Sequence, residues 1–202
     1  MTSCECHHVA KTKDERKTLI IALLLNAAMF IVGLISGIFA QSTALIADSF
    51  DMLSDALVYS LGLWAVGRAP HFKTIIARLS GGLLSLLGMG ILIEVGRRFW
   101  VGSSPESSVM IGVACLSLVV NTIVLVLLRK FRKRKGEAHL QATWIFTRAD
   151  VVANLGVVLS GILVILTKSR FPDLIVGFVI GLYVLKEAIE IFRLANSSSK
   201  SV

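Results

Sequence analysis

Residues 19–40 read LIIALLLNAAMFIVGLISGIFA and contain no charged side chain. A helix needs about 20 apolar residues to cross the hydrocarbon core of a bilayer. This stretch therefore predicts a membrane-spanning helix, and five further apolar runs follow it. We predict an all-α polytopic membrane protein with six transmembrane helices, at 19–40, 43–66, 75–95, 109–128, 140–166 and 174–192.

The composition excludes a soluble domain. Hydrophobic residues make up 55% of the 202 positions, the mean hydropathy is +0.79 and only 17% of residues are charged, which is too apolar for a soluble chain of this size. The net charge of +8 could suggest nucleic acid. Its basic residues lie between apolar segments, however, as in loops beside a membrane. We expect the lipid bilayer as a partner, and no nucleic acid.

The polar ends of the chain frame the predicted membrane domain. Residues 1–18 form a predicted cytoplasmic N-terminal tail, 19–192 a six-helix transmembrane domain, and 193–202 a short, Ser-rich cytoplasmic tail that we expect to be disordered. No short apolar core with a small-residue cleavage site precedes the first helix, so we expect no cleaved signal peptide. The three cysteines predict no disulfide framework.

The distribution of Lys and Arg predicts the orientation. Cytoplasmic loops hold the excess of these residues, and the N-terminal tail, the second and fourth loops and the C-terminal tail hold nearly all of them. The first, third and fifth loops offer only Arg97, Arg98, Lys168 and Arg170. We therefore predict that both termini are cytoplasmic. The expected location is a bacterial inner (plasma) membrane.

The second predicted helix carries Asp48, Asp51 and Asp55 on one helical face. An ionised Asp near the bilayer centre costs about 2.5 to 3.5 kcal/mol on insertion scales. Three on one face need a partner, protons or a watery cavity.

The fifth predicted helix adds a second oxygen-rich pair, Asp150 and Asn154, one turn apart. Together with Asp51 and Asp55 it supplies four oxygen ligands, the number that a tetrahedral divalent ion needs. We predict a metal site from these four residues. The alternative is interhelical hydrogen bonding, or an ion pair with the nearby Arg148.

Other polar residues are secondary candidates. Asp48 and Asn26 are candidates for the metal site or its pathway, whereas Asn121 is interpreted as a packing residue. His139 is interpreted as a solvated residue at the interface. A cluster of soft metal ligands near the N-terminus either captures metal or is part of an incidental polar tail. Its residues are Cys4, Cys6, His7 and His8.

Small residues four apart predict close helix packing. They occur in the first, fifth and sixth predicted helices as the pairs Gly33 and Gly37, Gly156 and Ser160, and Gly177 and Gly181.

Two stretches resemble the cation diffusion facilitators, a family of proton-coupled exporters of zinc and related divalent metals. Residues 41–55, QSTALIADSFDMLSD, resemble the second-helix motif in which a His or Asp and an Asp four residues later bind the transported metal. Residues 146–157, FTRADVVANLGV, are similar to the fifth-helix half-site, usually a His and then an Asp. The resemblance assigns Asp51, Asp55 and Asp150 as ligands.

The chain departs from the family pattern in two places. The usual fifth-helix His falls on Phe146, which cannot bind metal, so Asn154 is our candidate substitute. We also expect this chain to lack the C-terminal cytoplasmic domain found in many family members. A homodimer is implied by the resemblance and would form through transmembrane helices.

The resemblance implies metal/proton antiport by alternating access, with zinc as the first choice of substrate. An oxygen-only site is harder than the usual one and could favour manganese, iron or cobalt; cadmium is a further alternative. A channel, a proton-coupled exporter of organic cations and a scaffold with a structural metal also stay open. We expect no cofactor and no enzymatic activity, because the Gly-x-Gly-Asp context of an intramembrane aspartyl protease is missing around Asp150.

Overall fold

The computed structural model describes residues 3–39, 43–102, 107–133 and 137–199. Six long helices and one 3₁₀ turn make up this part of the chain, which confirms the predicted all-α class. The elements are α1 (Ser3–Phe39), α2 (Thr43–Ala65), α3 (Pro70–Val101), α4 (Ser107–Leu128), η1 (Arg129–Phe131), α5 (Ala138–Thr167) and α6 (Phe171–Ser199).

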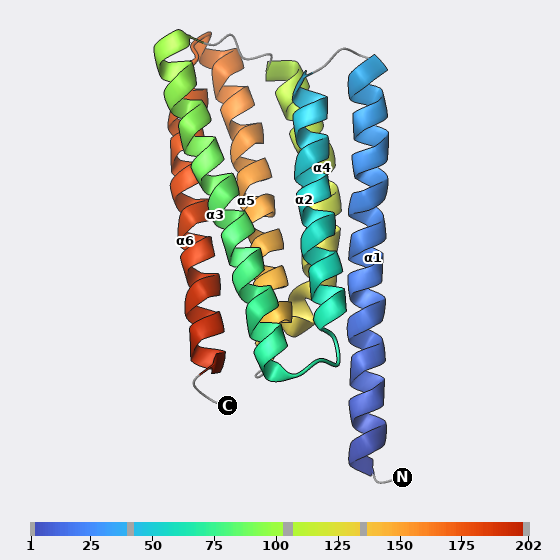
Figure 1. Ribbon diagram of the computed structural model, residues 1–202. Helices are drawn as coiled ribbons and strands as arrows, with labels where there is room; N and C mark the ends of the chain where they lie inside the picture. Colours follow the sequence, from blue (N-terminus) through green and yellow to red (C-terminus); the bar gives the residue numbers. More distant parts are fainter. Residues whose placement is uncertain (1–2, 40–42, 103–106, 134–136, 200–202) are drawn as a thin grey trace.

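The helices run alongside one another, and both termini lie at the same end of the bundle (Figure 1). We call this end, which also holds the α2–α3 and α4–α5 connections, the terminal end, and the opposite one the distal end. Along the chain, α1 packs mainly on α2, α4 on α5, and α3 on α6, while α5 also contacts α6 and α3. The bundle thus consists of a four-helix group with the α3–α6 pair against it.

Four described segments are long and apolar enough to cross a membrane: Thr12–Ser36, Pro70–Val101, Ile111–Phe131 and Ala138–Thr167. The other two helices run beside them in the bundle (Figure 1). α2 and α6 differ from these four segments in the ionisable residues within their apolar runs. These are three aspartates in α2, and Lys186, Glu187 and Glu190 in α6. Six crossings remain a prediction for α2 and α6.

Both outer helices are longer than predicted. α1 begins at Ser3 and extends past the other helices at the terminal end (Figure 1). An ion pair between Asp14 and Lys130, with 2.6 Å between carboxylate oxygen and ammonium nitrogen, connects this extension to η1. α6 continues to Ser199, so the expected disorder is wrong for residues 193–199. α3 reaches Val101, so Arg97 and Arg98 lie in a helix and not in a loop.

Glycines mark the close contacts between helices, as the small-residue pattern predicts. A β-carbon built on Gly33 of α1 would lie 2.6 Å from Ser49 Oγ of α2. One on Gly156 of α5 would lie 2.7 Å from Ile180 Cδ1 of α6. On Gly181 of α6 it would lie 2.6 Å from Leu92 Cδ2 of α3. These glycines permit the observed helix spacing.

Gly181→Ala should therefore destabilise the bundle. The added methyl group would also lie 2.8 Å from Leu92 Cγ, and overpacking of this kind costs about 1 to 3 kcal/mol. The matched control is Gly90→Ala in α3, where nothing lies within 4 Å of the new methyl group. Unfolding of both variants by sodium dodecyl sulfate in mixed micelles checks this. Equal stabilities would show that the α3–α6 contact is not sterically limited.

Candidate metal centre

α2 carries its three aspartates on successive turns from the distal end inward. Asp48 and Asp51 are half-buried, and Asp55 is only 1% exposed. Ser117 of α4 donates a hydrogen bond of 2.6 Å to Asp48 Oδ1. The acidic stripe thus begins near the distal surface and ends inside the bundle.

α5 places Asp150 opposite this stripe. Its side chain is 6% exposed and interacts electrostatically with both Asp55 and Asp51. Asp55 in turn interacts with Asp51, Asp150 and the α4 residue Asn121. The structure therefore brings the acidic residues of the second and fifth helices together.

No cation neutralises these carboxylates within the described residues. Arg148, the partner considered from the sequence, instead donates hydrogen bonds to Glu187 and to Glu190 of α6, the latter at 3.0 Å. The proposed ion pair between Arg148 and Asp150 is therefore not formed. Both carboxylate oxygens of Asp55 and Oδ2 of Asp150 are buried without a hydrogen-bond partner in the described part of the chain. Unpaired buried carboxylates need protons or a cation.

The carboxylates are not yet gathered around a single point. Among the described residues, no three His, Cys, Asp or Glu side chains are close enough together to hold one metal ion. Like charges at short range repel one another. Binding one cation thus requires the side chains of α2 and α5 to converge.

α4 adds polar groups that the sequence reasoning did not assign to the site. Ser117 and Asn121 are both fully buried and lie one turn apart, on the face toward α2. Both atoms of the Asn121 amide are buried without a hydrogen-bond partner among the described residues. Asn121 nevertheless lies beside the Asp55 carboxylate, so its interpretation as a packing residue stays a prediction. The detectable signal was two polar residues four apart in an otherwise strongly apolar helix.

The remaining candidates lie in different surroundings. Asn154 is 8% exposed on α5, and its side chain makes no hydrogen bond to the carboxylates within the described region. Asn26 donates to the carbonyl of Ala22 in its own helix at 3.0 Å, while its amide oxygen is unpartnered among the described residues. Phe146, at the position of the family's usual His, is fully buried in the apolar core.

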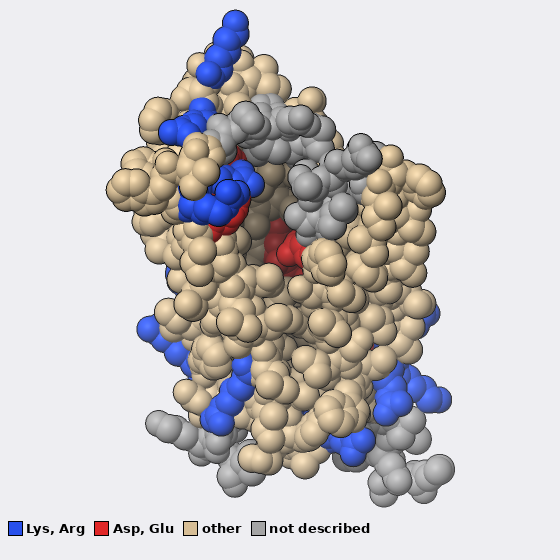
Figure 2. All heavy atoms as spheres, turned by 45° about the horizontal axis from the view of Figure 1, so that its top comes forward, with Lys and Arg blue, Asp and Glu red and all other residues tan. Residues whose placement is uncertain are grey.

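The bundle is hollowed at its distal end. Figure 2 shows the distal end, where a hollow between the helices has acidic atoms at its floor. On the terminal side of Asp55, the hydroxyl groups of Tyr59 and Thr147 are hydrogen-bonded at 2.9 Å, and both residues are fully buried. This contact joins α2 to α5 on the terminal side of Asp55.

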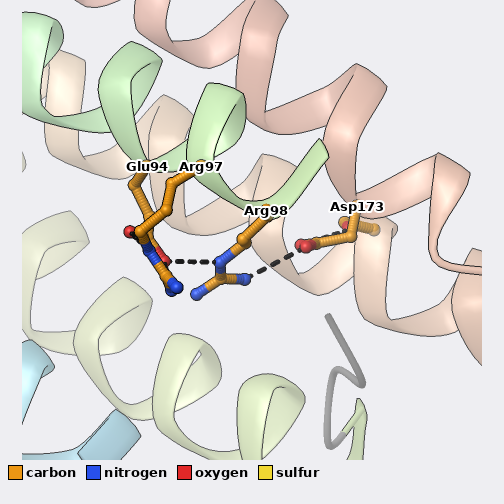
Figure 3. Close-up of polar contacts among 5 residues, drawn as sticks. Glu94, Arg97, Arg98 and Asp173 are labelled. Atoms are coloured by element: carbon orange, nitrogen blue, oxygen red, sulfur yellow. Dashed lines mark hydrogen bonds and ion pairs between the residues drawn. The ribbon is translucent and has the colours of Figure 1, made fainter. Parts of the chain in front are cut away.

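An ionic cluster joins α3 to α6 at the distal end (Figure 3). Arg97 and Arg98 both donate to Glu94, and Arg98 Nη1 also donates to Asp173 of α6 at 3.1 Å. Ser160 of α5 donates to the same aspartate at 3.4 Å. Two of the few distal cations are therefore balanced by local acids, which strengthens the charge asymmetry between the two ends.

Two groups near the terminal end complete the list of candidates. The side chains of Cys4, Cys6, His7 and His8 lie outside the described residues, so metal capture there stays a prediction. His139 is 1% exposed, with ring nitrogen Nδ1 3.7 Å from a Glu137 oxygen. The prediction of a solvated His139 is therefore wrong, because the neighbouring helices cover this first turn of α5.

These features define a membrane helical bundle with uncompensated acids between two helices, the kind of site that a cation carrier has. The family model of the cation efflux transmembrane domain matches residues 19–198. The chain belongs to the cation efflux family, the cation diffusion facilitators, and is an integral membrane protein of the bacterial plasma membrane.

Similar curated proteins are bacterial transporters. The chain is 23% identical to the cadmium, cobalt and zinc/H(+)-K(+) antiporter of Bacillus subtilis, over 88% of this chain and 61% of the relative. It is 27% identical to the metal cation efflux system protein CzcD of Cupriavidus metallidurans, over 84% of this chain and 57% of that relative. It is 24% identical to the zinc transporter ZitB of Escherichia coli, over 90% and 61%. The chain thus spans about three-fifths of the length of these relatives.

Proposed function

We propose that this protein exports a divalent metal cation, zinc in the first place, from the cytoplasm in exchange for protons. The observation that carries the proposal is the group of buried carboxylates on α2 and α5 with no cationic partner among the described residues. Membership of the cation efflux family and the zinc, cadmium and cobalt in the names of its relatives support it.

Asp51, Asp55 and Asp150 are the proposed metal ligands. A tetrahedral ion needs one more donor, and the sequence nominates Asn154. The position of Asn121 beside Asp55 makes its amide oxygen a second candidate for the same place. Asp48 lies on the acidic stripe of α2, and Asn26 lies in α1. A role for either in the metal pathway stays a prediction.

Proton coupling follows from direct competition for the same oxygens. Without metal, the acids can avoid mutual repulsion in an apolar bundle by holding protons. A dication supplies the compensating charge and displaces those protons on binding. With an inward proton gradient, protons entering from the distal side would drive metal out.

Alternating access requires a second arrangement of α2 and α5. A hollow lies at the distal end (Figure 2), and the Tyr59–Thr147 contact joins α2 to α5 on the other side of Asp55. Loading from the cytoplasm would need this contact to separate while the distal ends approach. The positive-inside rule supports the terminal end as the cytoplasmic one.

The choice of metal rests on the ligand type. With Phe146 in place of His, the proposed site has oxygen donors only, which suits harder ions such as manganese, iron or cobalt better than a site with imidazole would. Zinc is proposed first on family grounds, and cadmium is a further alternative from the relatives' names.

An organic-cation exporter is a weaker candidate because aromatic residues do not surround the acids. Phe50 and Trp64 are 54% and 56% exposed and pack against Phe30 and Phe72. Tyr59 is the exception, and its hydroxyl is engaged by Thr147. Large aromatic-lined sites are what organic cations need.

The identity of the fourth ligand is testable with two matched variants. If Asn121 coordinates the metal, Asn121→Leu should weaken zinc binding at least about tenfold, since changes even outside the ligand shell cost about 10- to 100-fold. Asn154→Leu should then have little effect. Isothermal titration calorimetry in detergent measures both. The reverse pattern would assign Asn154, and no effect of either would exclude an amide ligand.

Transport itself is tested in proteoliposomes with an acidic interior. Zinc, cadmium, cobalt and manganese are added outside and uptake is followed with a trapped metal-sensitive dye. We expect gradient-driven uptake of at least one metal, and at least about a tenfold loss in Asp55→Asn and Asp150→Asn because each removes a proposed ligand.

The control for this experiment is Asp14→Asn, the same chemical change at an exposed ion pair of the terminal end. It should retain wild-type flux. Absence of flux for every metal would refute the exporter, and equal flux in all three variants would refute the assigned site.

A further inference from the structure

A cavity of about 450 Å³ lies at the terminal end, between α5, α6 and the residue that follows η1. It is separate from the carboxylate site. Its lining includes three arginines, one from α5, one from α6 and one directly after η1, together with an indole, one carboxylate and a hydroxyl group. These residues are Arg132, Arg148, Arg193, Trp144, Glu190 and Ser197.

The lining is positively charged. Arg148 is balanced by Glu187 and Glu190, to which it donates hydrogen bonds. Arg132 and Arg193 have no ion-pair partner within the described residues. Three guanidinium groups against the two carboxylates that bind Arg148, Glu187 and Glu190, leave a net positive charge at the cavity, which favours an anion.

Trp144 holds two of the guanidinium groups close together. The Cζ atoms of Arg132 and Arg148 lie 5.2 and 4.8 Å from the centre of its ring, within cation–π range. Two N–H donors, Trp144 Nε1 and Arg148 Nε, are buried without an acceptor among the described residues. The indole thus fixes two guanidinium groups at the cavity, where their exposed N–H donors can reach an anionic acceptor.

We propose that this cavity binds the phosphate group of an anionic phospholipid from the leaflet at the terminal end. Arginine forks match the geometry of phosphate oxygens, and basic pockets between membrane helices on the cytoplasmic side suit anionic lipid head groups. Trp144 lies at this end of the apolar part of the bundle, the level that Trp prefers in a bilayer.

A lipid fits better than a free anion because apolar tracks lead away from the cavity. On α5, exposed Val152, Leu155 and Leu159 continue the helical face of Arg148 toward the distal end. On α6, exposed Leu182 and Ile189 share a face with Arg193. Acyl chains could lie along these faces while the phosphate occupies the cavity.

The test uses native mass spectrometry of the full chain in detergent with dioctanoyl-phosphatidylglycerol, dioctanoyl-phosphatidylcholine and glycerol 1-phosphate. We expect the phosphatidylglycerol to bind about tenfold more tightly than the phosphatidylcholine, and Arg193→Gln and Arg132→Gln each to weaken it about tenfold through loss of a charge-assisted hydrogen bond. The matched control is Arg129→Gln, an exposed arginine of η1 outside the cavity, which should bind as wild type does.

Several results would overturn the proposal. Equal affinity for the two lipids, or an equal loss in Arg129→Gln, would show unspecific surface electrostatics. Glycerol 1-phosphate binding as tightly as the lipid would show a free-anion site. A dimer that Arg193→Gln dissociates, with no lipid bound to the wild type, would assign the cavity to a second copy. Circular dichroism of Arg193→Gln must match the wild type, which its exposed position predicts.

Discussion

Two acidic side chains facing each other inside an apolar bundle set the constraint on this protein. Asp55 of α2 and Asp150 of α5 are almost completely buried and interact with each other, and the nearby Arg148 is committed to α6. Such a pair is costly in a membrane unless protons or a cation neutralise it. The proposed exchange of protons for a metal ion rests on this requirement for a neutralising charge.

The rest of the bundle fits this requirement. Close packing at Gly33, Gly156 and Gly181 fixes the helix pairs, so that carboxylates from distant parts of the chain meet. The Tyr59–Thr147 contact joins α2 to α5 on the terminal side of Asp55, and a hollow lies at the distal end (Figure 2).

Local sequence patterns predicted the helices, the acidic stripe on α2 and the packing glycines, because each depends on spacing within one helix. They could not predict which helix faces which. The approach of Asn121 to Asp55, the pairing of Arg148 with Glu187 and the burial of His139 all depend on how separate helices rotate and pack. The polar run after Phe192 resembled a disordered tail by composition, although it continues α6 to Ser199.

The most direct test of the central claim is the number of protons released when zinc binds, measured by calorimetry in buffers of different ionisation enthalpy. This measurement uses a variant in which the N-terminal cluster is removed, so that it cannot bind zinc. Its substitutions are Cys4→Ser, Cys6→Ser, His7→Ala and His8→Ala. If zinc and protons compete for the carboxylates, protons are released when zinc binds. Asp55→Asn should then bind zinc more weakly and release fewer protons per zinc ion. Zinc binding without proton release, or unchanged in Asp55→Asn, would contradict the account.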